Sequence, residues 1–286
     1  MLYVMEACTM ADEVDMVTLN LDDDNRVVIH MFGATVISWI CGGKERLFLS
    51  STSLFENGKA IRGGIPVVFP QFGPWKLGPQ HGFARISMWD LYSKKIADGR
   101  CSARFILINN EISEAMWNYK FKLIYDVTIS KTNGLSCSLS VTNQDSKVFD
   151  FTTLLHTYLK VDDAETVTVS NLQSLKYIDK LKNGEEFTES DSLLKVVNGI
   201  DRIYKSTPAT QEVFGCVDGS TVIVSKNGLP DTVVWNPWAE KARNMSDFDD
   251  DGYKKMICVE PGFVVERVIL QPQEERSFTQ NLVVTK

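Results

Sequence analysis

FKLIYDVTISKTNGLSCSLSVTN, residues 121–143, is the stretch that decides the fold. Its apolar side chains recur at every second position, a period that predicts two strands with one buried face each. Between the strands, Asn133-Gly134 predicts a tight turn, because glycine accepts the positive φ that such turns need. About ten residues per strand would span roughly 33 Å, a length that suits a large sandwich. The predicted buried positions are Phe121, Leu123, Tyr125, Val127, Ile129, Leu135, Cys137, Leu139 and Val141.

Similar turn-forming residue pairs recur along the chain. Asn-Gly or Asp-Gly pairs that predict turns stand at 57–58, 98–99, 183–184, 198–199, 218–219 and 227–228. Strand-like runs occupy residues 26–31, 35–40, 104–108, 149–159, 166–170, 221–225, 232–235, 256–259, 264–270 and 278–284, and a short helix is predicted at 239–244. We therefore predict an all-β fold, a large antiparallel β-sandwich of two packed sheets, in a single domain over residues 1–286.

Composition narrows the classes of function. The chain has 286 residues, 30 Lys+Arg against 37 Asp+Glu, and a net charge of −7, so it lacks the broad basic face of a nucleic-acid-binding protein. Six dilute cysteines without a C-x-x-C pair predict reduced thiols, and Cys137 and Cys258 lie in apolar runs typical of buried positions. The acidic N-terminus, with Glu6 and Asp12, lacks a secretion signal. We expect a cytoplasmic, soluble monomer with no membrane segment.

Residues 61–85 have an unusual composition and charge. Four prolines and five glycines between Arg62 and Arg85 favour a shaped loop over regular structure. Between Glu56 and Asp90 the sequence has no acidic residue, but it has four cations: Lys59, Arg62, Lys76 and Arg85. Such a loop could bind a small anion such as a phosphate, which arginine holds with two hydrogen bonds. Alternatively, the arginines pair with carboxylates of the acidic remainder of the chain.

Two further positions suggest acid–base chemistry. His156 lies within the strand-like run 149–159, where it could be a catalytic group or a hydrogen-bonded core residue. Glu260 follows the apolar run 256–259 and precedes Pro261-Gly262, which predicts a turn at a strand end. It could be a catalytic carboxylate or the partner of a nearby Arg267.

Two other features of the sequence are weaker evidence for a functional site. The acidic stretch 247–252 begins like a calcium-binding loop, but its twelfth position is Cys258 and not glutamate, so we interpret it as a solvated loop. Trp235 and Trp238 could form a platform for a sugar or pack in the core. The sequence has no metal-binding or nucleotide-binding motif, and we expect neither metal nor cofactor.

Four motifs together resemble the aldose 1-epimerase (galactose mutarotase-like) superfamily, and within it the hexose-6-phosphate mutarotase branch. They are IRGGIP at 61–66, PQHGFAR at 79–85, LHTY at 155–158 and VEPG at 259–262. The resemblance implies a galactose mutarotase-like supersandwich, with His156 as general acid and Glu260 as general base. It also implies substrate binding by Arg62, Gln80, His81, Arg85 and Asp201. Asp201 rests on a short motif, and it could instead pair with Arg202.

The expected activity is that of an isomerase which interconverts the α and β anomers of hexose 6-phosphates, chiefly glucose 6-phosphate. Ring opening removes a proton from the C1 hydroxyl and delivers one to the ring oxygen, which suits a carboxylate and an imidazolium. Arg62, Lys76 and Arg85 are the candidate phosphate contacts. Two alternatives remain: a non-catalytic sugar-phosphate-binding module, and a mutarotase for unphosphorylated aldoses.

Overall fold

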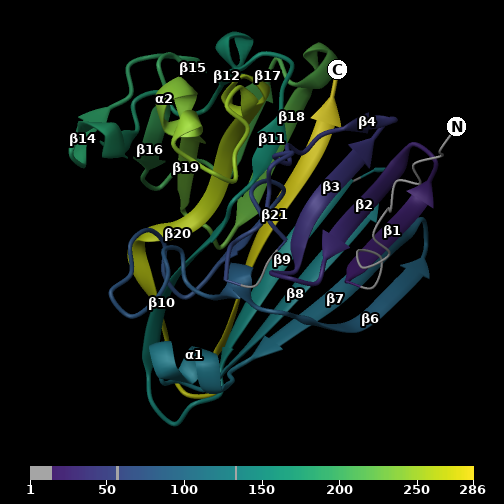
Figure 1. Cartoon of the computed structure of the whole chain (residues 1–286), viewed down its shortest axis with the longest axis vertical. Coiled ribbons are helices and arrows are strands. Elements are labelled where there is room, and N and C mark those ends of the chain that lie inside the picture. The colour runs from purple at the N-terminus through teal and green to yellow at the C-terminus, as the bar shows by residue number, and fades with distance from the viewer. Residues whose placement is uncertain (1–14, 56–57, 133) are drawn as a thin grey trace, which may run out of the picture.

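Three antiparallel sheets make up the computed structural model, which describes residues 15–55, 58–132 and 134–286 (Figure 1). The 4-stranded sheet has the order β1 (Met16–Asp22), β2 (Asn25–His30), β3 (Thr35–Cys41), β4 (Lys44–Glu45). The 9-stranded sheet has the order β15 (Leu194–Lys195), β12 (Thr168–Val169), β17 (Thr210–Phe214), β18 (Thr221–Asn227), β21 (Glu275–Thr285), β9 (Gly134–Asn143), β8 (Phe121–Ser130), β7 (Arg100–Ile108), β6 (Asp90–Ala97). The 8-stranded sheet has the order β14 (Glu185–Thr188), β13 (Lys176–Asp179), β16 (Ile200–Tyr204), β19 (Asp231–Asn236), β20 (Met256–Leu270), β10 (Phe149–Leu155), β5 (Val67–Val68), and β11 (Tyr158–Lys160) also pairs with β20.

The predicted hairpin is confirmed as β8 and β9. The two strands pair without a register shift from Phe121 opposite Asn143 to Ser130 opposite Gly134. All nine predicted apolar positions are buried, while the side chains between them are partly exposed. Gly134 has a φ of +67°, and a Cβ there would lie 2.1 Å from the carbonyl oxygen of Leu282. Asn133, the other residue of the predicted turn, lies outside the described residues.

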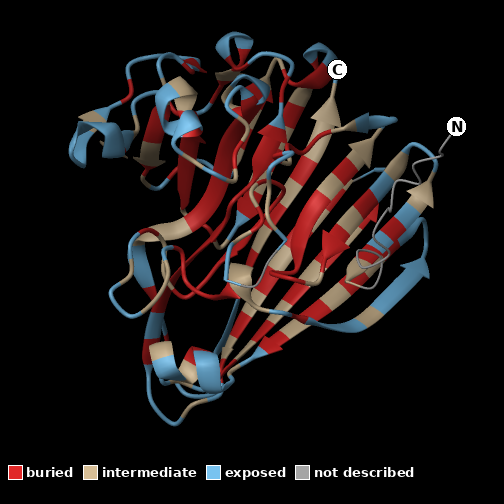
Figure 2. Ribbon diagram, in the orientation of Figure 1, coloured by how far each residue is buried: buried red, intermediate tan, exposed pale blue. Residues whose placement is uncertain are grey.

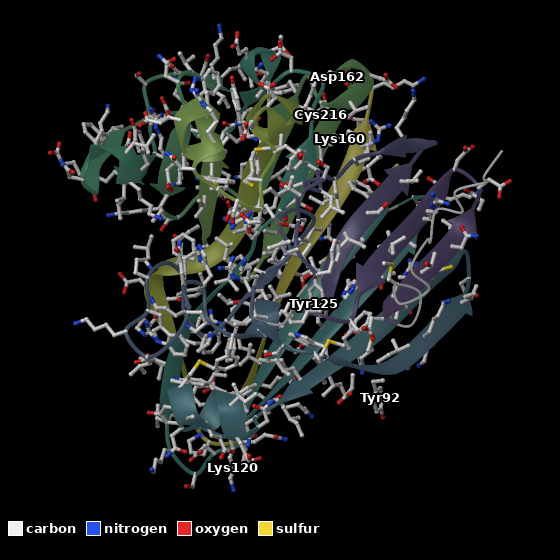
Figure 3. All side chains as sticks on the ribbon, viewed as in Figure 1. Tyr92, Lys120, Tyr125, Lys160, Asp162 and Cys216 are labelled. Carbon is white, nitrogen blue, oxygen red and sulfur yellow. The ribbon has the colours of Figure 1, made fainter. Side chains whose placement is uncertain are left out.

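One hydrophobic core joins the three sheets. It includes Trp39 from the 4-stranded sheet, Tyr125 from the 9-stranded sheet and Phe151 from the 8-stranded sheet. Figure 2 shows buried segments alternating with partly exposed ones along β7, β8 and β9, and Figure 3 labels Tyr125 in the middle of the molecule. The predicted all-β antiparallel sandwich is therefore confirmed, because alternate side chains of the large sheets meet in one shared core.

Two predicted strand boundaries were wrong, and both lie beside candidate site residues. The turn predicted at Pro261-Gly262 is absent, since β20 continues through it from Met256 to Leu270. Gly262 pairs with Asp231 on one side and Leu154 on the other, so pairing on both sides holds it extended. The run 149–159 is divided into β10 and β11, and His156 lies in the break between them.

Short elements account for the other differences. The helix predicted at 239–244 is α2 (Trp238–Arg243), and α1 (Glu111–Met116), capped by Asn110, was not predicted. The 3-10 turns are η1 (Ala84–Ile86), η2 (Ala164–Thr166), η3 (Lys180–Lys182), η4 (Val217–Gly219) and η5 (Gly252–Lys255). Because η2 includes Thr166, β12 is shorter than the predicted strand at 166–170. Glu6, Asp12, Cys8 and Asn57 lie outside the described residues. The described part of the chain contains no helix that is long and apolar enough to cross a membrane.

Candidate active site

Strand pairing places a row of functional side chains across one face of the 8-stranded sheet. Asp201 of β16 is opposite Trp235 of β19, which is opposite Cys258 of β20, which in turn is opposite Tyr158 of β11. Residues directly opposite each other in antiparallel strands point to the same face. These four side chains therefore lie side by side, on the face turned away from the main core.

His156 and Glu260 belong to the same face: His156 precedes Tyr158 by two residues and Glu260 follows Cys258 by two. Glu260 follows Cys258 at a spacing of two in β20, so the two side chains project to the same side. The backbone N–H of His156 donates to Pro66, which fixes the residue at the break between β10 and β11. The His156 ring stacks on Tyr158 with centroids 4.7 Å apart and planes 11° apart.

The loop 61–85 is bound beside this face by backbone hydrogen bonds, in which His156 donates to Pro66 and Tyr158 donates to Gly64. A Cβ on Gly64 would lie 2.0 Å from the carbonyl oxygen of Val36, and one on Gly82 would lie 2.1 Å from that of Phe69. Both glycines also have a positive φ. The IRGGIP and PQHGFAR motifs therefore need glycine so that the loop can pack closely against β3 and against its own Phe69. Folded in this way, the loop brings Arg62, Gln80, His81 and Arg85 to the site.

A cleft of about 260 Å³ lies between the loop and the sheet. The wall of this cleft contains all seven residues expected from the motifs: Arg62, Gln80, His81, Arg85, His156, Asp201 and Glu260. Two cations not anticipated from the sequence, Lys180 and Lys241, complete the wall, whereas Lys76 is exposed elsewhere on the loop. A space of this size suits one small polar molecule.

His156 and Glu260 form a close, buried pair at the base of the cleft. Nδ1 of His156 lies 3.4 Å from Oε1 of Glu260, and their side chains are 9% and 1% exposed. Neither carboxylate oxygen of Glu260 has a hydrogen-bond partner among the described residues. A buried carboxyl group without partners is costly, and such a group is typical of a site whose ligand supplies the missing donors.

The surroundings of this pair shift its proton toward the carboxyl group. Burial, reinforced by the negative charge of Asp201, raises the pKa of Glu260 well above its usual range. Burial, followed by the positive charges of Arg85 and Arg62, lowers the pKa of His156 well below its usual range. Both shifts favour the proton on the Glu260 carboxyl group and a neutral His156 imidazole. Burial and Arg85 likewise lower the pKa of His81 and keep it neutral.

The two arginines differ in how fully they are engaged. Nε and Nη2 of Arg62 donate to Asp247 at 3.2 and 3.0 Å, and Nη1 donates to the Tyr158 hydroxyl at 3.4 Å. Tyr158 and Asp247 thereby raise the pKa of Arg62, although burial alone would lower it. Arg85 donates from Nη2 to the carbonyl oxygen of Gln80 at 2.8 Å, and its buried Nε has no partner among the described residues. Arg85 thus keeps more donor capacity than Arg62, which also pairs with a carboxylate.

Residues 15–283 match the protein family described as Aldose 1-epimerase. The chain belongs to this family. It is 37% identical over 261 residues to a protein from Cenchrus ciliaris, covering 86% of this chain and 78% of the relative. It is 31% identical over 279 residues to a protein from Escherichia coli K12, covering 96% of this chain and 92% of the relative. Both relatives are named "Putative glucose-6-phosphate 1-epimerase".

Solved structures support the same family. A crystal structure of a "putative mutarotase (YeaD)" from Salmonella typhimurium superposes with a TM-score of 0.86 at 28% identity, covering 100% of this chain and 97% of that one. The resemblance to the aldose 1-epimerase superfamily, first inferred from four short motifs, is confirmed. In this epimerase-family chain those motifs lie far apart in sequence and converge on one cleft.

The structure also decides between the alternatives raised for single residues of this epimerase-family cleft. Glu260 does not pair with Arg267, which binds Asp150 instead. Asp201 does not pair with Arg202 either: its Oδ1 lies 3.7 Å from Nζ of Lys180 and its Oδ2 lies 3.5 Å from Nζ of Lys241.

One further expectation for the epimerase-family chain needs correction, and one open alternative is decided. The stretch 247–252 is not simply solvated, because Asp247 binds Arg62 and Asp249 accepts a hydrogen bond from the Ser51 backbone at 2.9 Å. Of the two tryptophans, Trp235 lies in the cleft wall, whereas Trp238 packs on Tyr253.

The two lysines come from elements that carry no recognisable motif. Lys180 begins the 3-10 turn η3 after β13, and its Nζ lies 5.3 Å from the centre of the Phe72 ring. Lys241 is in α2, with Nζ 5.6 Å from the centre of the Trp235 ring. They are 32% and 50% exposed, so both ammonium groups are accessible from the mouth of the cleft. Only the fold, which brings both to Asp201, could identify them.

Proposed function

We propose that this chain interconverts the α and β anomers of hexose 6-phosphates, chiefly glucose 6-phosphate, by acid–base ring opening and reclosure. The observation that carries the proposal is the buried His156–Glu260 pair in a cleft bordered by cations, where the carboxyl oxygens of Glu260 have no hydrogen-bond partner among the described residues. The family membership and the printed names of two relatives support the same chemistry.

The pair can perform the reaction with the single proton that it holds. Transfer of that proton from Glu260 to His156, 3.4 Å away, gives a carboxylate and an imidazolium without exchange with solvent. The carboxylate then accepts the proton of the C1 hydroxyl while the imidazolium donates its proton to the ring oxygen, which breaks the bond between C1 and that oxygen. The open aldehyde is left beside a neutral imidazole and a protonated carboxyl group, the protonation that burial and the neighbouring charges favour.

Ring closure reverses these transfers. After rotation about C1–C2, the neutral imidazole takes the proton of the C5 hydroxyl as its oxygen attacks the other face of the aldehyde. The protonated carboxyl group donates to the new C1 oxygenate, so no proton is gained or lost over the cycle. Positioned acid–base groups of this kind contribute about 10²- to 10⁴-fold to a rate.

The cations of the cleft suit the phosphate of the substrate. Arg62 is already neutralised by Asp247 at 3.0 Å, so we assign the phosphate contacts to Lys180, Lys241 and the unfilled donors of Arg85. Hydrogen bonds to a charged partner are about twice as strong as neutral ones, and here they would favour the phosphorylated sugar over the free one. Asp201, held between the two lysines, would accept hydrogen bonds from sugar hydroxyls.

Anomer exchange measured by NMR, for glucose 6-phosphate and glucose side by side, tests this proposal. Acceleration of glucose 6-phosphate well beyond that of glucose is expected. Equal acceleration of both sugars would keep the chemistry and contradict the phosphate site. Saturable binding without acceleration would instead indicate a sugar-phosphate-binding module.

The roles of the pair are tested by His156→Ala and Glu260→Gln. Each change should slow catalysed anomer exchange by at least about 100-fold, because each removes one of the two proton-transfer groups. Glu266→Gln is a matched control, since Glu266 is an exposed glutamate of the same strand β20 and should leave the rate unchanged. Urea unfolding would show whether the variants stay folded. A Glu260→Gln protein with the wild-type rate would contradict the assignment.

A further inference from the structure

Three side chains with metal-binding atoms meet at the base of the cleft. Sγ of Cys258 lies 3.8 Å from Nδ1 of His156, and Nδ1 lies 3.4 Å from Oε1 of Glu260. The donor atoms of all three residues lie within 4.8 Å of one another, and all three residues are buried. The mechanism above uses only His156 and Glu260, so the thiol of Cys258 has no part in the proposed reaction.

These distances match the edges of a tetrahedral zinc site. Zinc binds thiolate sulfur at about 2.3 Å, imidazole nitrogen at about 2.0–2.1 Å and carboxylate oxygen at about 2.0–2.2 Å. At tetrahedral angles those bonds separate sulfur from nitrogen by about 3.6 Å and nitrogen from oxygen by about 3.4 Å. The observed separations of these two pairs are 3.8 and 3.4 Å, whereas the sulfur and the carboxylate oxygen lie within 4.8 Å, so the ligand atoms could close around the ion by shortening this third edge.

The state of Glu260 independently points to a ligand at this place. Its side chain is 1% exposed, and neither carboxylate oxygen has a hydrogen-bond partner among the described residues, although Nδ1 of His156 lies 3.4 Å from Oε1. A zinc ion would supply the missing partner directly. Its two positive charges would be balanced by the carboxylate and by the thiolate of Cys258, so no net charge would be buried.

We propose that His156, Cys258 and Glu260 form a site for Zn²⁺. Water or a sugar hydroxyl fills the fourth coordination position of the ion, and the bound ion inhibits the reaction proposed above. On binding, the Cys258 thiol and the Glu260 carboxyl group each release a proton to solvent, and neutral His156 coordinates through Nδ1. Both proton-transfer groups of the proposed reaction are then held by the ion, and acid–base catalysis stops.

The ligand set makes the site selective for soft divalent ions. A thiolate and an imidazole favour zinc, whereas magnesium and calcium prefer oxygen ligands alone. Arg62, Arg85 and Lys180 lie in the same cleft and repel a cation, so the site binds zinc less tightly than a structural zinc site. The ion is therefore a reversible inhibitor, removable by a chelator.

The test uses Co²⁺ as a spectroscopic substitute for zinc. The ion is added to the full-length protein in a sugar-free buffer that contains a phosphine reductant. Wild-type protein should develop a near-ultraviolet thiolate-to-cobalt absorption that zinc abolishes and magnesium does not. Cys258→Ser should lose this absorption. Cys216→Ser should keep it, because Cys216 is an equally buried free cysteine that Figure 3 labels near the top of the molecule, beside Asp162.

Inhibition provides the second readout, with each variant compared with its own rate in the absence of zinc. Changes in outer partners of a metal alone alter affinity about 10- to 100-fold, so loss of the direct ligand Cys258 should raise the zinc concentration for half-inhibition at least about tenfold. The absence of a thiolate-to-cobalt absorption, or zinc inhibition unchanged in Cys258→Ser, would overturn the proposal. The cobalt spectrum does not depend on activity, so it distinguishes failure of this site from failure of the proposed function.

Discussion

At the residue scale, Lys180 and Lys241 carry the most specific prediction about substrate. Each ammonium group is near Asp201 and accessible at the mouth of the cleft. Lys180→Met and Lys241→Met should each lower kcat/KM for glucose 6-phosphate by about tenfold, since a hydrogen bond to a charged partner contributes about 1.5–3 kcal/mol and these groups are partly exposed. Anomer exchange of glucose, measured in parallel, should change little.

Lys76→Met is the matched control for these two lysines. Lys76 lies on the same loop as Arg62 and Arg85, but it is exposed and lies outside the cleft wall. Its substitution should leave both substrates unaffected. Equal losses for glucose and glucose 6-phosphate in Lys180→Met would instead show that Lys180 acts by positioning Asp201.

The predictability of single residues depended on whether they belonged to a motif. His156, Glu260 and the residues of the loop stood in short patterns, and the structure brings them together. The neighbourhood of Cys258 was missed, because an isolated cysteine in an apolar run is usually an ordinary core residue. Its spacing of two from Glu260 was the available signal, since alternate residues of a strand share a face.

At the element scale, the loop 61–85 works only because its glycines permit close packing. Gly82→Ala would combine a positive φ of +73° with a Cβ 2.1 Å from the carbonyl oxygen of Phe69. Left-handed backbone costs about 1–2 kcal/mol for an L-residue, and overpacking adds about 1–3 kcal/mol. We expect a loss of roughly 2–5 kcal/mol in the free energy of unfolding, measured by urea denaturation.

Gly99→Ala separates the two contributions. Gly99 has nearly the same φ, +70°, but no atom lies within 4 Å of the Cβ position. Its substitution should therefore show only the backbone cost of about 1–2 kcal/mol. Similar losses at both sites would mean that Gly82 moves away from Phe69 within the loop without further cost, which contradicts a rigid loop.

Strand existence was predictable from alternation, but strand continuity was not. Pro261-Gly262 has the composition of a turn, yet Gly262 is held extended by partners on both sides of β20. Those partners, Asp231 and Leu154, lie far from it in sequence. A local pattern carries no information about them, so tertiary pairing overrides the turn preference.

At the scale of the whole molecule, the order of strands was the least predictable feature. The site depends on β20 lying between β19 and β10, and on β11 pairing with β20. Alternation indicates which face of a strand is buried, but the choice of neighbour is made by side chains as far as a hundred residues apart, such as Tyr158 and Cys258. Family resemblance could supply this order, whereas composition and periodicity could not.

Whole-molecule stability should depend on alkaline pH through Lys226, a lysine of β18 that is only 8% exposed. Its Nζ donates to the backbone oxygen of Asp231 at 3.0 Å, while both oxygens of the Asp231 carboxylate accept backbone N–H groups. Burial lowers the pKa of Lys226 from its usual 10.5 to about 8. Below pH 8 the ammonium is charged in both the folded and the unfolded chain, and the cost of burying it is fully present.

Between pH 8 and pH 10.5 the folded protein releases the Lys226 proton while the unfolded chain keeps it, so the free energy of unfolding rises with pH. A shift of this size corresponds to a gain of up to about 3 kcal/mol across that interval. Lys226→Met removes this titration, so the wild-type curve should rise relative to the variant curve when both are measured by urea denaturation. Lys95→Met, at an exposed lysine of β6, should run parallel to wild type. Parallel curves for wild type and Lys226→Met would mean that the buried ammonium keeps its charge through the whole interval.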